Sequence, residues 1–237
     1  IRHFASKTRT QDFAREIGVR VPETYTNIRT IAEFDAFDFP ERYVLKPDFG
    51  SGTYLFLMHE GLNLFDGFAY TRNDIRTLVA KHLSESTQAE FVVEEFITQQ
   101  GIDPKRPIIP LDYKIHSFGG RARFIQAIDK NTISRDVFHQ RQNWLSRDWT
   151  QTPFPIRFPE PPNDPVNPPD CFEDLLRVAD DIAKRLDDYV RVDLYASDDG
   201  PMLGEVTSFS NAGKGFSEYG DMILGQTWEI FSDWRRF

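Results

Sequence analysis

The chain has 237 residues, of which 40% are hydrophobic, a formal net charge of −9 and an isoelectric point near 5.1. This length suits one large domain or two lobes that share a cleft, and the acidic balance disfavours binding to nucleic acid or to an anionic membrane surface. The single cysteine, Cys171, excludes an intramolecular disulfide and fits a reducing compartment such as the cytoplasm. No apolar run approaches the roughly 20 residues of a membrane-spanning helix, and no signal peptide is recognisable. Because the chain begins with Ile1, we expect it to be a segment of a longer polypeptide.

Three segments in the first half of the chain have the residue spacing of helices. Lys7–Ile17 has apolar residues at helical spacing and is followed by Gly18, a typical stop. Ala32–Phe37 forms a further helical turn before a proline. A longer helix is capped by Asn73 or Asp74, and its apolar face consists of Ile75, Leu78, Val79 and Leu83.

A β-hairpin with a glycine-containing tip is predicted between the first helices. The strand Tyr43–Lys46 runs into the loop Pro47–Gly52, and Thr53–Met58 resumes as a strand. In a Walker loop the lysine follows the glycines and opens a helix, whereas here Lys46 precedes them and a strand follows. This order fits a loop that folds over phosphates, because the backbone N–H groups of glycines can approach phosphate oxygens closely. The other interpretation is an ordinary glycine hairpin with an exposed lysine.

Two central segments carry charged residues on predicted strands. Phe91–Ile97 is a buried strand with two acidic residues, Glu94 and Glu95, toward its end, which are either solvated or part of a hinge that binds a nucleobase. Asp112–Ile128 forms a hairpin about Gly119-Gly120, a strong turn sequence. This hairpin predicts three juxtapositions: Lys114 opposite Ile125, His116 opposite Arg123, and Asp112 on the same face as Lys114. Surface strands carry such charges routinely, so these residues alone do not establish a site.

The remaining segments before the C-terminal hairpin are a polar stretch, a proline-rich crossing and a helix. His139-Gln140-Arg141 is interpreted as a loop. Residues 153–169 contain eight of the fifteen prolines, so this segment is expected to cross the surface without regular structure. Phe172–Leu186 is the clearest helix, and the tail from Glu218 is expected to add one or two helices. The inner face of the clearest helix consists of Leu175, Leu176, Ala179, Ile182, Ala183 and Leu186.

The stretch Val190–Asn211 reads as a strand, an acidic turn and a returning strand. If the hairpin closes at this turn, Asp193 lies opposite Glu205 and Arg191 lies opposite Thr207. Opposed residues have Cβ atoms about 5 Å apart, so two carboxylates placed there repel each other. A hard divalent cation such as Mg²⁺ between them would remove this repulsion. The alternative is a solvated acidic pair beside Arg191 with no ligand.

The order of these elements resembles the ATP-grasp superfamily and, within it, the TupA-like branch named for teichuronopeptide biosynthesis. The resemblance extends from about Lys7 to Phe216. It is carried by the segments Tyr43–Gly52, Asp112-Tyr113-Lys114, His139–Trp149, Val190–Tyr195 and Gly204–Thr207. It implies an α+β fold in which two lobes with antiparallel sheets grip ATP between them. Residues 1–92 would form the N-terminal lobe with the phosphate loop, and residues 93–237 the C-terminal lobe with the adenine hinge and the metal-site hairpin.

The resemblance also assigns roles to individual residues. ATP would be bound by two lysines, a mobile glycine loop, an adenine hinge and a basic residue near the triphosphate: Lys7, Lys46, Gly50, Ser51, Gly52, Thr53, Glu94, Glu95, Phe96, Ile97 and Lys114. Lys114, Arg191 and Arg141 would form the catalytic set of cations near the phosphates or a carboxylate substrate. Asp193 and Glu205 would bind one or two Mg²⁺ ions. Many superfamily members carry Asn where this chain has Thr207, so Thr207 or Asn211 would complete the metal site.

The activity implied by this resemblance is ATP-dependent ligation of a carboxylate to an amine through an acylphosphate. By analogy with the branch, the reaction would belong to the synthesis of polysaccharides, cell-surface glycopolymers or peptides, with other domains of a longer chain as possible partners. Two alternatives stay open: an ATP-grasp kinase that phosphorylates a hydroxyl, and a non-catalytic nucleotide- or glycan-binding module of a larger synthase. Nucleic-acid partners and membrane insertion are not expected.

Overall fold

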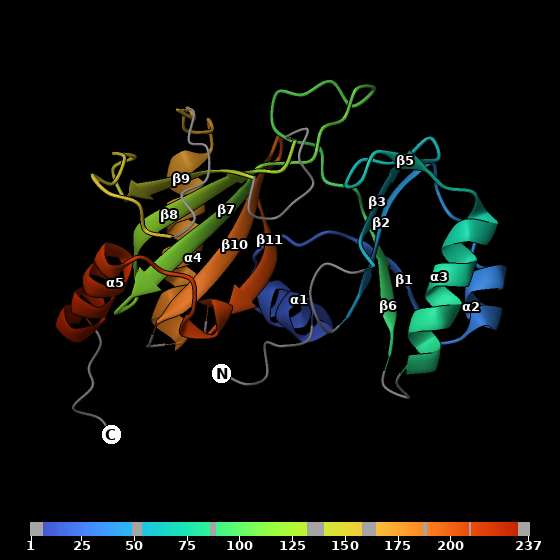
Figure 1. The fold of residues 1–237 in the computed structure, drawn as a ribbon, viewed down its shortest axis with the longest axis horizontal. Helices are drawn as coiled ribbons and strands as arrows, with labels where there is room; N and C mark the ends of the chain where they lie inside the picture. Colours follow the sequence, from blue (N-terminus) through green and yellow to red (C-terminus); the bar gives the residue numbers. More distant parts are fainter. Residues whose placement is uncertain are drawn as a thin grey trace.

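The structure, a computed structural model, contains two antiparallel sheets that lie side by side, with helix α1 (Lys7–Glu16) at the base between them (Figure 1). It describes residues 7–48, 54–85, 89–131, 140–157, 165–186, 189–208 and 210–231, without the side chains of residues 7, 8, 211 and 212. Within these ranges, no helix is long and apolar enough to span a bilayer. The α+β architecture with two antiparallel sheets agrees with the fold class expected from the sequence.

The first sheet has six strands in the order β1-β6-β2-β3-β4-β5. Its strands are β1 (Thr24–Ile28), β2 (Arg42–Pro47), β3 (Phe56–His59), β4 (Leu62–Asn63), β5 (Phe68–Ala69) and β6 (Phe91–Glu94). Helices α2 (Ile31–Ala36) and α3 (Arg72–Glu85) flank one face, as Figure 1 shows. Alternate residues of β2 therefore have different surroundings: Tyr43 and Leu45 join the core under these helices, whereas Lys46 lies on the other face.

The start of α3 lies earlier than the sequence suggested. Asn73 and Asp74 are inside the helix, and Thr71 precedes its first residue. The Thr71 hydroxyl accepts a hydrogen bond from the Asp74 backbone N–H (3.2 Å), and the Asp74 carboxylate accepts one from the Thr71 N–H (2.8 Å). This reciprocal arrangement satisfies two backbone donors at once, so Thr71 caps the helix and Asp74 completes the capping box.

The second sheet has five strands in the order β11-β10-β7-β8-β9. They are β7 (Asp112–Phe118), β8 (Arg121–Asp129), β9 (Arg141–Ser146), β10 (Val190–Ser197) and β11 (Gly200–Thr207). Helix α4 (Phe172–Leu186) covers one face of this sheet, and its expected apolar residues are buried there, with Leu186 only partly covered. Because α4 packs on one face with Tyr113 and Ile115, Lys114 and Asp193 lie on the opposite face, where their side chains are 18% and 4% exposed.

The β10–β11 hairpin has the expected register at Arg191 and Asp193 and a different register near its turn. Asp193 pairs with Glu205 and Arg191 pairs with Thr207, which confirms these two juxtapositions. Beyond Asp193 the register shifts by one residue, because Gly204 is an extra residue in β11. A side chain is excluded there, since a Cβ atom on Gly204 would lie 2.7 Å from the Tyr195 ring.

The β7–β8 hairpin corrects the predicted juxtapositions of Lys114 and His116. Lys114 lies opposite Gln126 rather than Ile125, and His116 lies opposite Phe124 rather than Arg123. The cause is again a bulge, because the register shifts between His116 and Ser117. The turn itself was placed correctly, but an extra residue in one strand moves all later pairs by one position.

Two further segments differ from the expectations or complete the fold. Arg141 begins strand β9, so the segment interpreted as a loop becomes the edge of the second sheet from that residue on. The proline-rich crossing is described only at its ends, residues 153–157 and 165–169. The C-terminal tail contains a short 3-10 helix, η3 (Ser210–Gly213), and helix α5 (Glu218–Phe231).

The two sheets are linked by short backbone contacts beside the segment that follows β6. The Gln100 N–H donates to the Ala196 carbonyl in the β10–β11 hairpin (3.0 Å), and the Leu203 N–H in β11 donates to the carbonyl of Arg20, which lies between α1 and β1 (2.8 Å). Helix α1 belongs in packing terms to the second sheet, because it contacts β11. The lobe boundary between residues 92 and 93 therefore stays a prediction. Helix α1 belongs to the N-terminal part of the chain but packs on the second sheet, which the C-terminal part forms.

Candidate functional site

The face of the second sheet opposite α4 carries rows of charged side chains across neighbouring strands. Paired residues in antiparallel strands have side chains on the same face. Asp193 on β10 pairs with Lys114 on β7 and with Glu205 on β11. The next row contains His116, Arg191 and Thr207. The sheet register therefore brings together residues that are far apart in sequence.

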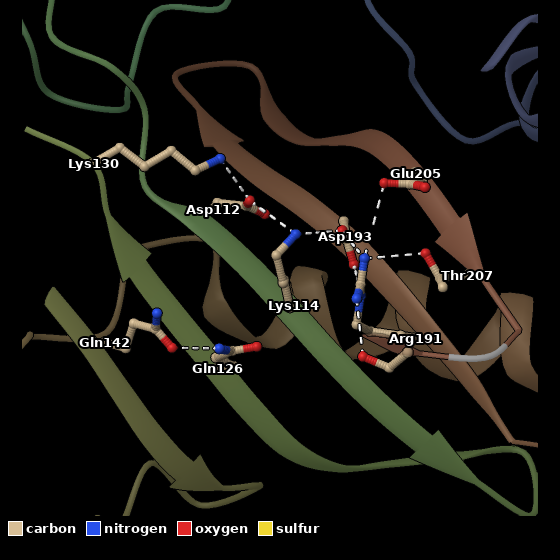
Figure 2. Close-up of polar contacts among 10 residues, drawn as sticks. Asp112, Lys114, Gln126, Lys130, Gln142, Arg191, Asp193, Glu205 and Thr207 are labelled. Atoms are coloured by element: carbon tan, nitrogen blue, oxygen red, sulfur yellow. Dashed lines mark hydrogen bonds and ion pairs between the residues drawn. The ribbon is translucent and has the colours of Figure 1, made fainter. Parts of the chain in front are cut away.

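Asp193 is the centre of a buried ion-pair network (Figure 2). Its side chain is 4% exposed, and both of its oxygens accept hydrogen bonds from the Arg191 guanidinium, at 2.6 Å from Nε and 2.8 Å from Nη2. Lys114 Nζ lies 2.5 Å from the same carboxylate and 3.0 Å from Asp112, and Asp112 also binds Lys130 (2.9 Å). Forked charge-assisted bonds of this kind are the stronger hydrogen bonds of proteins.

The network sets the protonation states of its members. Burial alone would raise the pKa of Asp112, but Lys114 and Lys130 lower it below its usual value. Burial would likewise lower the pKa of Lys114, but Asp112 and Asp193 raise it. Arg191 is also held in its charged form, because Asp193 raises its pKa against the effect of burial. The face therefore presents fixed cations and anions at neutral pH.

The three residues expected to bind Mg²⁺ all lie around the Arg191 guanidinium. Arg191 Nη2 donates to Asp193 and to Thr207 Oγ1 (3.1 Å), and it lies 3.9 Å from Glu205, whose side chain is 50% exposed. Arg191 Nη1 donates to Ser210 (3.0 Å). In the described part of the chain, no group of three His, Cys, Asp or Glu residues is arranged to hold a metal ion. Carboxylate and hydroxyl oxygens are ligands that suit Mg²⁺. For Mg²⁺ to bind here, the Arg191 side chain would have to move away from Asp193.

On the first sheet, Lys46 forms an ion pair with Glu94. Glu94 is 3% exposed, and its second oxygen accepts a hydrogen bond from the Gln11 side chain of α1 (3.0 Å). Val44 pairs with Glu94 and Lys46 pairs with Val92, which places the lysine and the glutamate on one face of the sheet. The structure thus joins the expected phosphate lysine to the first residue of the expected hinge. The Gly50–Thr53 loop and the Lys7 side chain lie outside the described residues.

The segment Glu95–Ile97 leaves the first sheet beside the tip of the β10–β11 hairpin. A cavity of about 280 Å³ lies there, and four of its lining residues are Glu95, Phe96, Ile97 and Thr98. Its other walls come from the β10–β11 hairpin, from the starts of β1 and β2 and from the segment between α1 and β1: Ser197, Asp198, Asp199, Met202, Tyr25, Arg42 and Arg20. None of Lys46, Lys114 and Asp193 lines this cavity. The cavity therefore lies at the expected adenine hinge and does not include the charged rows.

Arg141 is separated from the charged rows by the order of the strands. It begins β9, at the edge of the sheet opposite β11, and its side chain is exposed. The neighbouring Gln142, which binds Gln126 (2.6 Å), alternates with it along the strand. A catalytic role for Arg141 stays a prediction that these positions do not support.

Sequence reasoning missed Lys130, Ser210 and Gln11 as partners of the site. Lys130 follows β8 directly and reaches Asp112 only because β8 pairs with β7. Gln11 belongs to a helix that packs on the other sheet, and its contact with Glu94 spans 83 positions. The spacing of residues along the sequence does not predict contacts between distant segments. The positive charge of Lys130 was the one feature that could have suggested a carboxylate partner.

The family comparison decides the relationship of the chain. The model of the family described as TupA-like ATPgrasp matches residues 6–229. The chain belongs to the TupA-like ATP-grasp family. No curated protein matched the sequence.

Solved structures with the same fold include several ATP-grasp ligases. D-alanine–D-alanine ligase from Bacillus anthracis, complexed with ATP, matches with a TM-score of 0.52 and 16% identity over 96% of this chain and 67% of that one. The corresponding ligase from Helicobacter pylori matches with 0.51 and 15%, over 96% and 60%. The L-amino acid ligase from Bacillus licheniformis matches with 0.50 and 13%, over 90% and 42%. This TupA-like chain therefore spans between about two fifths and two thirds of the length of these ligases, and identities this low establish the fold alone.

Proposed function

We propose that this TupA-like protein is an ATP-dependent ligase that joins a carboxylate to an amine. One observation carries the proposal: Lys114, Arg191, Asp193 and Glu205 meet in adjacent rows on the face of the second sheet opposite α4. These rows supply fixed cations for phosphate oxygens and a pair of carboxylates for a divalent ion. The family and the ligase fold of the solved structures support the same reaction class.

In the proposed reaction, a carboxylate oxygen of the substrate attacks the γ-phosphorus of ATP, and ADP leaves. The amine nitrogen then attacks the carbonyl carbon of the acylphosphate, inorganic phosphate leaves, and the nitrogen loses a proton. Catalysis here consists of positioning and charge neutralisation, for which Lys114 and Arg191 provide preorganised cations. Mg²⁺, held by Asp193, Glu205 and Thr207 when Arg191 withdraws, would neutralise phosphate charge. Both nucleophiles in this reaction belong to the substrates, so the protein does not need to supply one.

We assign the adenine to the hinge Glu95–Ile97 and the phosphates to Lys46, Lys114 and the loop Gly50–Thr53. The family relationship favours a cytoplasmic role in glycopolymer, polysaccharide or peptide synthesis, with a small-molecule or glycopolymer carboxylate and an amine as substrates. The solved structures with this fold include D-alanine–D-alanine ligase and L-amino acid ligase. Domains outside this chain would complete the selection of the substrates.

Calorimetric titration with ATP, with and without Mg²⁺, tests the nucleotide site. Wild type is expected to bind ATP more tightly with Mg²⁺, and Asp193→Asn/Glu205→Gln is expected to lose this metal-dependent part. Retention of the full Mg²⁺ effect in the double variant would contradict the site assignment. Lys46→Ala is the companion variant, and equal ATP affinity in it and in wild type would remove Lys46 from the phosphate site.

Screening of carboxylate and amine pairs for ADP release then tests the reaction class. A ligase releases ADP and forms an amide only when both substrates are present with ATP. ADP release with a hydroxyl compound and no amine would favour the kinase. Nucleotide binding without turnover for any pair would favour a non-catalytic module.

A further inference from the structure

We propose that Gln11 of helix α1 is a positioning residue for the binding of the ATP phosphates. In this role its side chain fixes the Glu94 carboxylate, and Glu94 in turn fixes the Lys46 ammonium group that is assigned to the phosphates. The inference deepens the proposed function and rests on it, because it names a residue outside the nucleotide site that sets the strength of phosphate binding.

Gln11 belongs to a helix that is anchored on the second sheet. Ala14 of this helix is fully buried in the core of that sheet, and Phe13 and Ile17 pack against the same core. Helix α1 also contacts strand β11, and Figure 1 shows the helix at the base between the two sheets. The position of α1 is therefore tied to the sheet that carries Glu205.

The side chain of Gln11 contacts the first sheet instead. Thr24 on β1 pairs with Glu94 on β6, so these two side chains lie on the same face. The Gln11 amide bridges them: the Thr24 hydroxyl donates to Oε1 (2.8 Å), and Nε2 donates to the Glu94 carboxylate (3.0 Å). Arg15 also donates to Oε1 (3.3 Å). An ionised carboxylate only accepts hydrogen bonds, so the amide nitrogen of Gln11, which is 3% exposed, must face Glu94.

Glu94 uses its other oxygen to hold Lys46. Val44 pairs with Glu94, and Lys46 follows two residues later on the same face of β2. The Lys46 ammonium group forms an ion pair with Oε1 of Glu94, and the two side chains are only 15% and 4% exposed. An ammonium group has three N–H donors, so Lys46 can bind a phosphate oxygen without leaving Glu94.

These bonds order Lys46 before a nucleotide binds. A free lysine side chain loses rotamer freedom when a ligand fixes it, and groups that are ordered in advance bind more tightly. The order extends back to Gln11, because one oxygen of buried Glu94 accepts from Gln11 and the other from Lys46. Loss of the Gln11 donor would leave a buried carboxylate oxygen unpaired. Glu94 would then turn to recover a hydrogen bond, and Lys46 would lose its fixed position.

The same contacts link the two sheets at the proposed phosphate site. Lys46 lies on the first sheet and Lys114 on the second, and both are assigned to phosphates. Helix α1 packs on the second sheet, whereas its Gln11 binds Glu94 and through it Lys46 on the first. Gln11 therefore fixes the phosphate lysine of one sheet relative to the other sheet, as a ligand that contacts both lysines requires.

Calorimetric titration of the whole chain with ATP and Mg²⁺ tests the role of Gln11. Gln11→Leu nearly keeps the size of the side chain and removes the amide, and it is expected to weaken ATP binding about tenfold, because a hydrogen bond to a buried charged group is lost. Thr24→Val removes only the hydroxyl that orients the amide and is expected to weaken binding about threefold. Glu16→Gln, at an exposed position of the same helix, is the matched control and should bind ATP as wild type does.

A double-mutant cycle with Lys46→Ala separates positioning from a general loss of packing. If Gln11 acts through Lys46, Gln11→Leu/Lys46→Ala is expected to bind ATP no more than about twofold more weakly than Lys46→Ala alone. Full addition of the two losses would overturn the proposal, and so would wild-type affinity in Gln11→Leu. Circular dichroism and thermal unfolding without ATP check that each variant is folded. If Gln11→Leu does not fold, Thr24→Val takes its place, and its loss of affinity should vanish in the Lys46→Ala background.

The cycle distinguishes failure of this role from failure of the proposed function. Weaker ATP binding in Lys46→Ala together with wild-type affinity in Gln11→Leu rejects the positioning role and leaves the phosphate site in place. Equal ATP affinity in wild type and Lys46→Ala rejects the phosphate site and the role of Gln11 with it. Non-additive losses without ADP release for any carboxylate and amine pair would support the positioning role and reject the ligase reaction.

Discussion

Arg191 fills a place between side chains that were expected to share a divalent ion. Two opposed carboxylates need a cation nearby, and in this structure the guanidinium supplies it while also binding Thr207. The same interactions oppose metal binding, because an ion must displace a buried fork of hydrogen bonds. If the proposed metal binds there, we expect Arg191 to compete with it for Asp193 in the absence of nucleotide.

Arg191→Gln is expected to increase the affinity for Mn²⁺ in the absence of nucleotide by about tenfold or more, because the competing charge is removed. Mn²⁺ electron paramagnetic resonance measures free and bound ion directly. Loss of the ion pair is also expected to lower the free energy of unfolding by about 3 kcal/mol, which chemical denaturation checks. Arg191→Lys keeps the charge and is the control, and equal Mn²⁺ affinity in wild type and Arg191→Gln would refute the competition.

At the level of elements, the β10–β11 hairpin positions the charged rows through a single bulge. Gly204 takes up the extra residue, so that Asp193 and Glu205 remain opposed while the turn closes one position away from the symmetric arrangement. The Tyr195 ring lies over Gly204, and there is no room for a Cβ atom. The placement of Glu205 opposite Asp193 thus depends on Gly204, a residue that cannot itself contact a ligand through a side chain.

Gly204→Ala is expected to destabilise the protein by about 1–3 kcal/mol through overpacking against Tyr195, and to weaken Mg²⁺-dependent ATP binding. Thermal unfolding and calorimetry measure the two effects. Gly225→Ala in α5 is the matched control, because nothing lies within 4 Å of a Cβ atom there, and it should stabilise by about 0.5–1 kcal/mol. An unchanged stability in Gly204→Ala would show that the ring moves aside freely.

For the whole molecule, buried His116 makes stability depend on pH. Burial, followed by the charges of Arg191, Lys114 and Arg157, holds the pKa of His116 well below its usual 6.5, and Tyr189 faces its Nδ1. In the unfolded chain the histidine binds a proton as the pH falls below about 6.5, whereas the folded chain does not. Protons therefore favour unfolding in this range, and stability falls as the pH falls.

The free energy of unfolding of wild type is expected to drop by up to about 2 kcal/mol between pH 7 and pH 5 through this group, at about 1.4 kcal/mol per pH unit. His116→Gln should lack this part of the dependence. Urea denaturation at both pH values measures the difference. Equal pH dependence in the two proteins would mean that folded His116 is protonated as readily as the unfolded one.

Much of this architecture is visible in the local sequence. Helix α4 has the predicted bounds because its apolar spacing is that of a helix with one buried face. The opposition of Asp193 and Glu205 was predicted from two alternating strands about a turn, and the Gly204 bulge preserves it although the turn closes one position away. Period and turn chemistry are properties of neighbouring residues, so they need no knowledge of the fold. The family resemblance rests on the same short motifs.

Other features depend on the packing of distant segments. Both bulges arise from contacts across strands: the one in β8 decides which residues lie opposite Lys114 and His116, and the one at Gly204 decides which residues pair near the tip of the β10–β11 hairpin. Lys46 was expected to be available to phosphates, but it forms an ion pair with Glu94. Asp193 was expected to be available to a metal ion, but it forms an ion pair with Arg191. Burial makes an unpaired charge costly, so the tertiary structure selects partners by proximity, and sequence spacing contains no measure of that proximity.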